Sequence, residues 1–402
     1  MSVSATKKDG KLNIAMVGHK RIPSREGGIE IVVEELSTRL VKMGHKVTCY
    51  NRNGHHVSGR NFDEPIERKL YKGVTLKKVP TISRKGLAAV TSSITGAFCT
   101  AMGRYNVVHF HAEGPCVMCW LPKLFGKRVI ATIHGLDHRR AKWGRFARAY
   151  IMLGEKAAVK YADEIIVLSR AVQKYFKDTY GRETKFIPNG VVRPEGRDDR
   201  LIKTQFELEK EGYFLFLGRI VPEKGLRYLI EAFKKVKTNR KLVIAGGSSD
   251  SEEFVKEIQE MAVDDKRICF TGFIQGKLYE SIFSNAYVYV LPSDLEGMPL
   301  SLLEAMSYGN CCLVSDIPEC AEVVKEYGVI FERSNVEALR EALQRLEDKP
   351  ELVQRYQEKA ADYICQKYNW DDAVKQTLAL YRKNRHICHI GGYAINGEEK
   401  IE

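Results

Sequence analysis

The sequence predicts an α/β protein built from two Rossmann-like, doubly wound domains in tandem, and three observations support this fold class. The chain has 402 residues, which suits two domains of about 150 to 200 residues each. Short apolar runs alternate with amphipathic stretches along the chain, and a polar segment at 193–200 separates two such series. This alternation is typical of parallel sheets that are covered by helices on both faces.

The first series begins with an apolar run that ends at Gly18, followed by a polar loop and by apolar residues at helical spacing between Ile31 and Val41. Its predicted strands are 11–18, 46–50, 106–110, 128–133 and 164–168. The second series predicts strands at 213–217, 241–245, 268–271, 287–291 and 311–314. Ligands of doubly wound domains bind at the carboxyl ends of the strands, so the loops after these strands are the candidate functional segments.

The composition is that of a globular protein, with 44% hydrophobic and 29% charged residues. Ten cysteines at irregular spacing, and a start without an apolar secretory segment, predict a reducing cytoplasm rather than a disulfide framework. Cys116 and Cys119 have the spacing of a zinc pair, but no second pair follows and their neighbours are apolar. We expect a buried helix there and no metal site.

Charge is distributed unequally along the chain. Residues 1–200 contain 37 Lys and Arg against 18 Asp and Glu, and residues 201–402 contain 27 against 33, so the formal charges are +19 and −6. The first half is therefore expected to face an anionic partner, either a membrane surface or nucleic acid, although no nucleic-acid-binding motif accompanies it.

The densest basic segment, 138–150, places Trp143, Phe146 and Tyr150 at helical spacing beside several arginines. This pattern suits either a helix at a membrane interface or a domain helix whose aromatic rings pack inward. A second segment, 86–103, carries no charge over 18 residues, which is the length of a membrane span. Glycine, threonine and serine dilute it, so we expect a buried or interface helix instead.

The loop after the first strand lacks the Gly-x-Gly-x-x-Gly fingerprint, which argues against a nicotinamide-dependent dehydrogenase. It contains Gly27 and Gly28 directly before a predicted helix. Such a pair either presents backbone N–H groups to a phosphate or substrate, or forms an ordinary turn at the start of the helix.

The loop after the first strand of the second series contains Gly218, Arg219 and Lys224, before a helix predicted around 226–236. A planar guanidinium and a mobile ammonium together suit a diphosphate, whose negative charge grows when a bond to it breaks. The segments 271–274 and 315–319 follow other strands of the same series, so we expect them at the same cleft.

Glu296 and Glu304 lie on either side of a Gly-Met-Pro bend and a short apolar run. Ser301 and Glu304 fit a capping box, in which case Glu304 satisfies amides at a helix start and Glu296 is a solvated loop carboxylate. Alternatively, the loop carboxylate, the bend and the helix N-terminus together hold a polyhydroxylated anion.

Together these motifs resemble the retaining GT-B glycosyltransferases of family 4. The resemblance rests on Gly218-Arg-x4-Lys224-Gly, Glu296-Gly-Met-Pro-Leu-x3-Glu304-Ala-Met, the segment 315–319 and the loop Gly27-Gly28-x-Glu30, and it extends from about residue 12 to 383. It implies the GT-B fold, with an acceptor-side domain at 1–200, a donor domain at 201–365 and a segment at 366–402 whose helix returns to the first domain.

The resemblance also implies a role for each matching residue. Arg219 and Lys224 would bind the donor diphosphate, Glu296 would hold donor-sugar hydroxyls, and Glu304 would bind the nucleotide ribose. Phe273 and Ile274 would contact the base. The other implied donor-binding positions are Gly27, Gly28, Gly218, Gly297, Met298, Pro299 and Leu300.

His134 follows a predicted strand and matches the family's first-domain histidine that reaches the transferred sugar, the alternative being a structural role. With Arg219, Lys224 and Glu296 it completes the expected catalytic set. His111 and Glu113 also follow a strand and would line the acceptor side, or else make ordinary loop contacts.

The implied reaction transfers a sugar, with retention, from a UDP- or GDP-linked donor without a required metal or other cofactor. The segments 135–144 and 18–23 resemble enzymes of bacterial surface-polysaccharide synthesis, which implies a hexosyl or deoxyhexosyl transfer to a glycan or a polyprenyl-diphosphate-linked sugar. The expected location is cytoplasmic, peripheral on the inner face of an anionic membrane, with no nucleic-acid partner. Competing interpretations are a GT-B nucleotide-sugar epimerase and a non-catalytic basic protein that binds membranes or nucleic acid.

Overall fold

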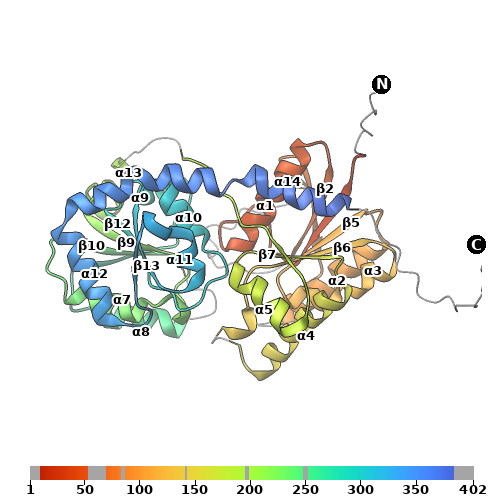
Figure 1. Cartoon of the computed structure of the whole chain (residues 1–402), viewed down its shortest axis with the longest axis horizontal. Coiled ribbons are helices and arrows are strands. Elements are labelled where there is room, and N and C mark those ends of the chain that lie inside the picture. The colour runs from red at the N-terminus through yellow and green to blue at the C-terminus, as the bar shows by residue number, and fades with distance from the viewer. Residues whose placement is uncertain are drawn as a thin grey trace, which may run out of the picture.

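Two open β-sheets, each flanked by helices, make up the computed structural model of the chain (Figure 1). The structure describes residues 10–52, 69–82, 87–140, 143–194, 199–247 and 252–383. Lys142 of the basic segment, residues 195–198 of the polar segment and the tail after residue 383 lie outside the described residues. The two sheets correspond to the two predicted strand series, so the predicted fold class is confirmed.

The N-terminal sheet has the strand order β3-β4-β2-β1-β5-β6-β7-β8, and all neighbours are parallel except β3 with β4. All five predicted strands are confirmed, whereas the short edge strands β3 and β8, and β4, have no prediction. The strands are β1 (Asn13–Val17), β2 (Lys46–Arg52), β3 (Leu70–Tyr71), β4 (Val74–Val79), β5 (Val107–His111), β6 (Arg128–Ile133), β7 (Glu164–Val167) and β8 (Lys185–Phe186).

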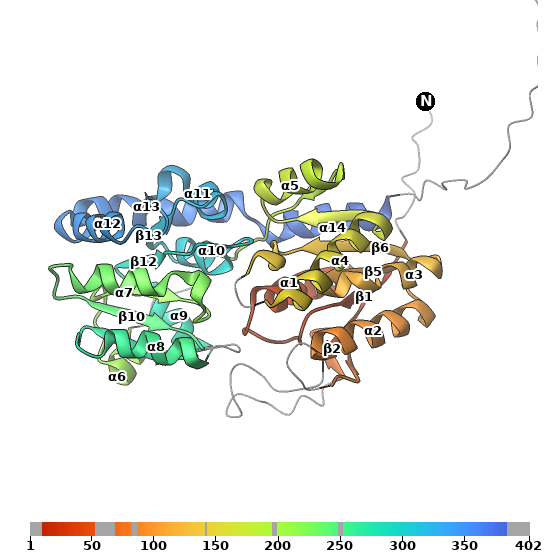
Figure 2. The ribbon, with the colours of Figure 1, turned by 90° about the horizontal axis from the view of Figure 1, so that it is seen from below.

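Helices lie on both sides of this sheet (Figure 2). Helix α5 has clear local signals, because the Ser169 hydroxyl accepts a hydrogen bond from the Val172 amide at its start and Gly181 ends it with a φ of 62°. The helices are α1 (Gly28–Lys42), α2 (Leu87–Met102), η2 (Gly114–Met118), α3 (Trp120–Leu124), η3 (Asp137–Arg139), α4 (Arg145–Tyr161) and α5 (Arg170–Tyr180).

Residues 87–102 of the uncharged segment form α2, which buries one side and exposes Phe98 and Met102 on the other. Within the described part of the chain, no helix is long and apolar enough to span a membrane. Cys116 and Cys119 are buried, as expected, although Cys116 lies in the 3-10 helix η2 rather than in an α-helix.

The prediction of a single helix for the basic segment 138–150 is wrong. The short η3 ends at Arg139 and α4 begins only at Arg145, so Trp143 precedes the helix. The inward-packing interpretation also fails for Phe146, whose side chain is 94% exposed, while Tyr150 is half-buried.

The C-terminal sheet is fully parallel, with the order β11-β10-β9-β12-β13-β14. Its predicted strands are confirmed, and β14 is an additional edge strand. The strands are β9 (Tyr213–Leu217), β10 (Lys241–Ala245), β11 (Ile268–Gly272), β12 (Val288–Leu291), β13 (Cys311–Ser315) and β14 (Val329–Phe331). The helices are α6 (Arg200–Phe206), η4 (Pro222–Lys224), α7 (Leu226–Lys234), α8 (Glu252–Ala262), α9 (Lys277–Ser284), α10 (Leu300–Ser307), α11 (Pro318–Val324), η5 (Lys325–Tyr327), α12 (Val336–Asp348) and α13 (Pro350–Lys367).

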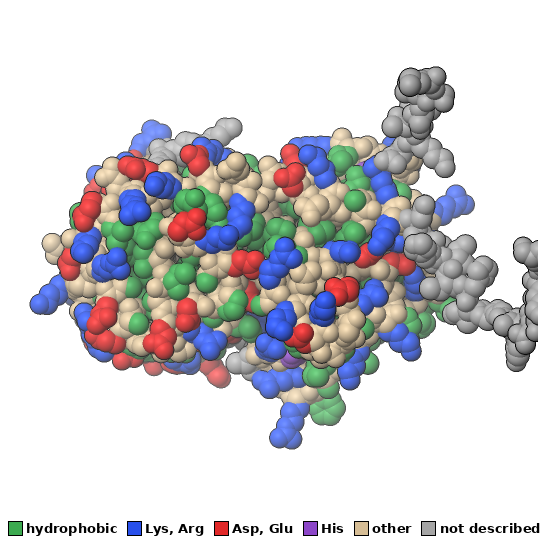
Figure 3. All heavy atoms as spheres, in the orientation of Figure 1, with side chains coloured by type: hydrophobic (Ala, Val, Ile, Leu, Met, Phe, Trp, Pro, Cys, Tyr) green, Lys and Arg blue, Asp and Glu red, His purple; other side chains and the backbone are tan. Residues whose placement is uncertain are grey.

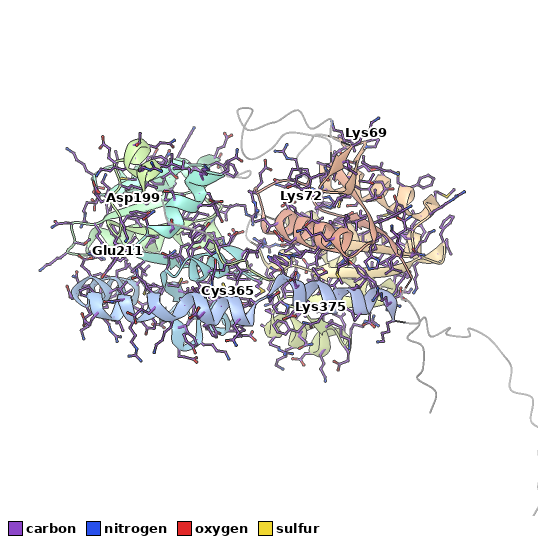
Figure 4. All side chains as sticks on the ribbon, turned by 90° about the horizontal axis from the view of Figure 1, so that it is seen from above. Lys69, Lys72, Asp199, Glu211, Cys365 and Lys375 are labelled. Carbon is purple, nitrogen blue, oxygen red and sulfur yellow. The ribbon has the colours of Figure 1, made fainter. Side chains whose placement is uncertain are left out.

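The last described helix, α14 (Trp370–Arg382), leaves the C-terminal sheet and packs against α1 of the N-terminal part (Figure 4, where Cys365 lies on α13 and Lys375 on α14). Asp371 accepts a hydrogen bond of 2.7 Å from Arg39, and the Tyr381 hydroxyl lies 2.6 Å from His109 Nδ1. These contacts tie the end of the chain to the first sheet. The boundaries at residues 200 and 365 stay predictions.

Strand order reverses direction at one place in each sheet, between β1 and β5 and between β9 and β12. At such a switch point the loops that leave the two neighbouring strands diverge and open a crevice. In the N-terminal sheet Gly27 and Glu113 lie in these loops, Gly28 is the first residue of α1 and His111 is the last residue of β5. In the C-terminal sheet they are 218–225 and 292–299, which contain the predicted donor-binding residues.

Candidate active site

The two domains touch where the loop after β6 meets the loop after β12. A Cβ atom added to Gly297 would lie only 1.6 Å from the backbone oxygen of His134, and one added to Gly135 would lie 3.1 Å from the Gly297 Cα. A side chain at residue 297 would therefore separate these loops. The predicted sugar-binding bend and the predicted first-domain histidine are thus direct neighbours.

The glycine pair after β1 lies against the same bend. A Cβ atom on Gly28 would approach Leu300 at 3.4 Å, and one on Gly27 would lie 2.5 Å from Glu30 Oε2. The other oxygen of Glu30 accepts a 2.8 Å hydrogen bond from the Lys20 amide, so this carboxylate holds the loop folded over the helix start. The loop therefore reaches the start of α10 in the other domain.

Lys224 and Glu296 form a nearly buried ion pair in the C-terminal domain. The Lys224 ammonium lies 2.5 Å from Glu296 Oε1, and the Ser293 hydroxyl donates to the same oxygen at 2.6 Å. Burial opposes ionisation of Glu296, but the Lys224 charge and these hydrogen bonds lower its pKa. Glu296 is therefore a fixed carboxylate, and the interpretation as a solvated loop residue is wrong.

Backbone geometry holds these two loops together. Gly225 has a φ of 70°, and a Cβ atom there would lie 1.9 Å from the Pro292 carbonyl oxygen, so only glycine fits. The Asp294 amide also donates to the Glu223 carbonyl at 2.9 Å. Lys224 and Glu296 meet because their loops share this backbone contact.

Arg219 is half-buried at the end of β9 and forms no hydrogen bond or ion pair with any described residue. Burial lowers its pKa, and the nearby charge of Arg140 adds to this effect. Arg140 comes from the N-terminal domain, where its Nε atom lies 2.7 Å from Asp137, and its Nη1 atom reaches Glu223 of the other domain at 3.3 Å. The guanidinium groups of Arg140 and Arg219 therefore lie near each other at the domain boundary, where they can bind an anion.

Glu304 faces the same crevice from α10 and accepts a 2.5 Å hydrogen bond from the Tyr279 hydroxyl. Burial raises its pKa, and the Tyr279 contact only partly offsets this. The capping-box interpretation is wrong, because α10 begins at Leu300 with Pro299 before it and no side chain caps it. Ser301 instead accepts a 2.8 Å hydrogen bond from Tyr289.

The remaining expected donor-binding residues lie around these groups. Phe273 and Ile274 follow β11, with Ile274 buried and Phe273 half-buried. Gly218 follows β9 directly. The Met298 sulfur accepts a hydrogen bond of 3.1 Å from the Asn189 amide of the segment between the domains. Contact of these residues with a nucleotide stays a prediction.

The buried His111 and the half-buried His134 form a pair on the N-terminal side. His111 Nδ1 lies 3.1 Å from His134 Nε2, so one ring donates and the other accepts. Burial lowers the pKa of His134 to about 4 and that of the neighbouring His109 to about 3, and it lowers the pKa of His111 well below the usual value. All three rings are therefore neutral near pH 7.

Glu113 is fully buried and does not face the crevice as an open carboxylate. Its Oε2 atom accepts a 2.8 Å hydrogen bond from the Asp137 amide, and its Oε1 atom lies 3.8 Å from His138. Burial raises the pKa of Glu113 to about 10. Its predicted contact with an acceptor stays a prediction, but the structure places it beneath the loop 134–140.

A cavity of about 230 Å³ opens beside Glu296 at the domain boundary. Its walls combine Arg139, Lys174 and Tyr175 of the first domain with Glu319 of the second. The Arg139 guanidinium lies over the Tyr175 ring at 5.1 Å. This cavity combines an aromatic ring with cationic and acidic groups, which can fix the orientation of a polar ligand.

Sequence comparison agrees with this geometry. Residues 198–363 match the family described as glycosyl transferases group 1, and residues 26–193 match glycosyltransferase family 4. The chain belongs to these GT-B glycosyltransferases. An uncharacterised glycosyltransferase of Methanocaldococcus jannaschii is 24% identical over 92% of this chain and 98% of its own length.

Two further relatives of this glycosyltransferase carry functional names. The alpha-maltose-1-phosphate synthase of Mycolicibacterium smegmatis is 24% identical over 92% of this chain and 99% of its own. The O-antigen chain mannosyltransferase of Salmonella typhimurium is 25% identical over 54% of this chain and 60% of its own.

Solved structures confirm the fold of this glycosyltransferase. Sucrose-phosphate synthase from Thermosynechococcus elongatus superposes with a TM-score of 0.76 at 21% identity, covering 93% of this chain and 99% of that one. HepE of Anabaena, in complex with UDP and glucose, superposes with a TM-score of 0.75 at 15% identity, covering 91% and 98%. The GT-B fold expected from the sequence is therefore confirmed.

Sequence reasoning missed two residues at this glycosyltransferase site. Arg140 was assigned to the basic surface segment, yet it bridges to Glu223. Tyr279 had no assignment, yet it holds Glu304. Neither lies in a spacing pattern, and only the position of Tyr279 on α9, after the 271–274 loop, could have drawn attention to it.

Proposed function

We propose that this glycosyltransferase moves a hexosyl or deoxyhexosyl group from a UDP- or GDP-linked sugar to a glycan or a polyprenyl-diphosphate-linked sugar, with retention at the anomeric carbon. The observation that carries the proposal is the convergence of Arg219, Lys224, Glu296 and Glu304 at the carboxyl ends of the central strands of one sheet. UDP is the first nucleotide to test, because HepE of Anabaena binds it.

In the proposed donor complex, the diphosphate lies against Arg219 and Lys224, and the N-terminal amides of α10 face it. Arg219 has no competing described partner, so binding an anion there breaks no existing ion pair. Lys224 shares its charge between the diphosphate and Glu296. These cations neutralise the leaving diphosphate as the bond to the sugar breaks, and the proposed reaction needs no metal for that step.

The sugar lies between Glu296 and His134. Glu296 is ionised and accepts hydrogen bonds from sugar hydroxyls, while the neutral His134 can donate one from its ring. Retention follows if the acceptor oxygen bonds to the anomeric carbon on the face that the diphosphate leaves. The bond from that carbon to the phosphate oxygen breaks, and this oxygen takes the proton of the acceptor hydroxyl.

The acceptor enters through the cavity beside Glu296. Arg139, Lys174 and Tyr175 line its first-domain wall and would bind an acceptor sugar or its phosphate groups. His111 supports this side by fixing the ring of His134. Glu113 supports it from beneath the loop 134–140.

An apolar surface on the N-terminal domain supports a membrane-bound acceptor. Its helices α2, α3 and α4 pack on one another through α3, and green and blue side chains project from the lower edge of this domain in Figure 3. Most of the exposed large apolar side chains of the described residues belong to these helices or their ends, namely Leu87, Ile94, Phe98, Met102, Trp120, Leu124, Phe125, Phe146, Met152 and Leu153.

The same helices or their ends also carry exposed cations, including Arg104, Arg145, Arg148 and Lys156. Apolar side chains surrounded by cations are typical of proteins that bind anionic bilayers at the interface. We propose that the enzyme works at the cytoplasmic face of a membrane, in the synthesis of a cell-surface polysaccharide. The named role of the Salmonella relative in O-antigen chains agrees with this proposal.

A thermal-shift panel of nucleoside diphosphates and their sugars tests the donor site. Ligand at about 100 times its Kd should stabilise the protein by about 2.7 kcal/mol. The parent and Arg227→Ala, an exposed arginine of α7, should respond to one nucleotide series, and Arg219→Ala should not. A folded parent that responds to none of them would reject the donor site.

A further inference from the structure

Glu113, His138 and Glu155 form a buried cluster outside the donor site. Glu113 follows β5, His138 lies on η3 and Glu155 lies on α4, so three separate elements meet there. Both carboxylates are 0% exposed. One ligand-type atom from each residue lies within 4.8 Å of the other two. Two buried carboxylates in contact require a compensating positive charge or a proton.

His138 lies close to both carboxylates but makes no hydrogen bond of normal geometry to either. His138 Nδ1 lies 3.2 Å from Glu155 Oε2 and 3.8 Å from Glu113 Oε1. None of these three atoms, nor Glu155 Oε1, has a hydrogen-bond partner of normal geometry among the described residues. Ligands at about 2.1 Å around a tetrahedral ion are about 3.4 Å apart, which agrees with both distances.

The surroundings orient these groups toward one another. Glu113 Oε2 accepts the Asp137 amide at 2.8 Å, which leaves Oε1 to face His138. Hydrogen bonds of this kind to the outer oxygen of a carboxylate are usual around protein-bound metal ions. The ring of Tyr175, on α5, lies 6.0 Å from the ring of His138, and burial together with hydrogen bonding to Glu155 raises the pKa of Tyr175.

We propose that Glu113, His138 and Glu155 together bind one divalent transition-metal ion such as Zn²⁺ or Mn²⁺. Two carboxylates and one imidazole form a donor set that these ions accept. The ion neutralises two charges that no other described cation neutralises as closely. This site goes beyond the proposed transfer reaction and replaces the expectation that the chain holds no metal, while leaving the donor diphosphate to Arg219 and Lys224.

The ion would stabilise the loop 134–140, through which the N-terminal domain contacts the C-terminal domain. His138 belongs to the same loop as Arg140, which reaches Glu223 at 3.3 Å, and as Gly135, which packs against Gly297. Binding His138 to a strand end and to α4 fixes this loop. Loss of the ion therefore weakens the contact between the domains without removing a donor-binding group.

Metal analysis of the purified full chain tests the site. After incubation with Zn²⁺ or Mn²⁺ and gel filtration, the parent should retain about one ion per chain. His138→Gln and Glu155→Gln should each weaken retention by at least about 100-fold. Glu183→Gln, an exposed carboxylate that pairs with Lys177, is the matched control and should bind as the parent does.

A shared proton is the competing way to satisfy the two carboxylates, and thermal unfolding distinguishes it. With an ion, a chelator lowers the Tm of the parent, and Glu113→Gln lowers it as well and removes the response to added metal. With a proton, the chelator has no effect and Glu113→Gln leaves the Tm unchanged or raises it. That second result, or a parent that retains no ion, would overturn the proposal. Neither outcome depends on nucleotide-sugar binding.

Discussion

The ammonium of Lys224 lies 2.5 Å from Oε1 of Glu296, and both residues are 9% exposed. They are 72 residues apart in the chain and belong to the loops after β9 and β12. The pair brings a cation for a phosphate and a carboxylate for sugar hydroxyls to one point. Because each charge compensates the other, the site can hold both while it contains no ligand.

Removal of one partner should therefore cost more stability than removal of both. Lys224→Met leaves the Glu296 carboxylate buried without its cation, with an expected loss of about 3–5 kcal/mol. Lys224→Met combined with Glu296→Met should regain most of this loss while remaining inactive. Urea unfolding of the parent, the single variants and the double variant measures the difference. Losses that simply add would show that the two charges are not coupled.

Gly297→Ala should separate the domains at the active site. Its Cβ would lie 1.6 Å from the His134 carbonyl oxygen, so the loops must move apart. A displacement of about 1 Å between catalytic groups can reduce a rate by about 100-fold. We expect that loss in the transfer rate, with nucleotide binding retained. Gly144→Ala, where nothing lies within 4 Å of the added carbon, is the control and should keep its activity.

Tyr279→Phe should weaken recognition of the ribose. The Tyr279 hydroxyl holds Glu304 at 2.5 Å, so its loss frees a carboxylate that is proposed to bind ribose hydroxyls. A loss of about 1.4 kcal/mol would weaken the affinity for the nucleoside diphosphate about tenfold. Tyr279→Phe should weaken binding of the 2′-deoxy analogue less. Tyr213→Phe, which removes a hydroxyl that donates a hydrogen bond to the Ile282 carbonyl, is the control and should keep the parent's nucleotide affinity. Equal losses of affinity for the nucleotide and for its 2′-deoxy analogue would show that Tyr279 has no role in ribose recognition.

The buried histidines should make the protein less stable in acid. Burial lowers the pKa of His134 to about 4 and of His109 to about 3, below the unfolded value of about 6.5. Between these values the unfolded chain binds protons that the folded chain does not, so stability falls as the pH drops from about 6.5 toward 4. Each such histidine contributes about 2 kcal/mol of loss at pH 5.

This pH dependence can be assigned with a variant. His109→Gln removes one titrating ring, so its Tm should fall less between pH 7 and pH 5 than that of the parent. The variant starts from a lower Tm at pH 7, because His109 lies 2.6 Å from Tyr381 and 2.7 Å from Thr132. Parallel Tm curves for the two proteins would mean that folding does not lower the pKa of His109.

Phe146 should contribute to membrane binding. Its side chain is 94% exposed at the start of α4, beside Arg145 and Arg148. We expect Phe146→Ser to reduce co-sedimentation with anionic vesicles several-fold and not with neutral ones. Val263→Ser changes a side chain that is 81% exposed in the other domain and is the control. A parent protein that does not sediment with anionic vesicles at low salt would contradict the proposed membrane binding.

Local patterns predicted the strands and the loops that carry chemistry, because a buried parallel strand followed by a polar loop has a clear signature. They placed Lys224 and Glu296 at one cleft through the rule that carboxyl ends of strands converge. They gave a wrong result where a shift of one or two residues decides where a helix begins. Ser301 lies in the first turn of α10 rather than before it, so the capping box does not form.

Contacts between distant residues were also invisible in the sequence. Arg140 and Glu223 are 83 positions apart and meet only because the two domains pack together. In the sequence Arg140 is one of several arginines near Trp143, so a surface role was the natural interpretation. Glu113 appears as a polar loop residue after a strand, and its burial near Glu155 depends on how α4 packs.

Consumption of a nucleotide sugar is the central test of the proposed activity. We would measure the release of nucleoside diphosphate from a panel of UDP- and GDP-linked sugars, for the parent and for Arg219→Ala. A lipid extract would supply the acceptors. The proposed activity predicts that the parent consumes one donor series and that Arg219→Ala consumes it at least about 100-fold more slowly. A folded parent that consumes none of them, or a variant that matches the parent, would contradict it.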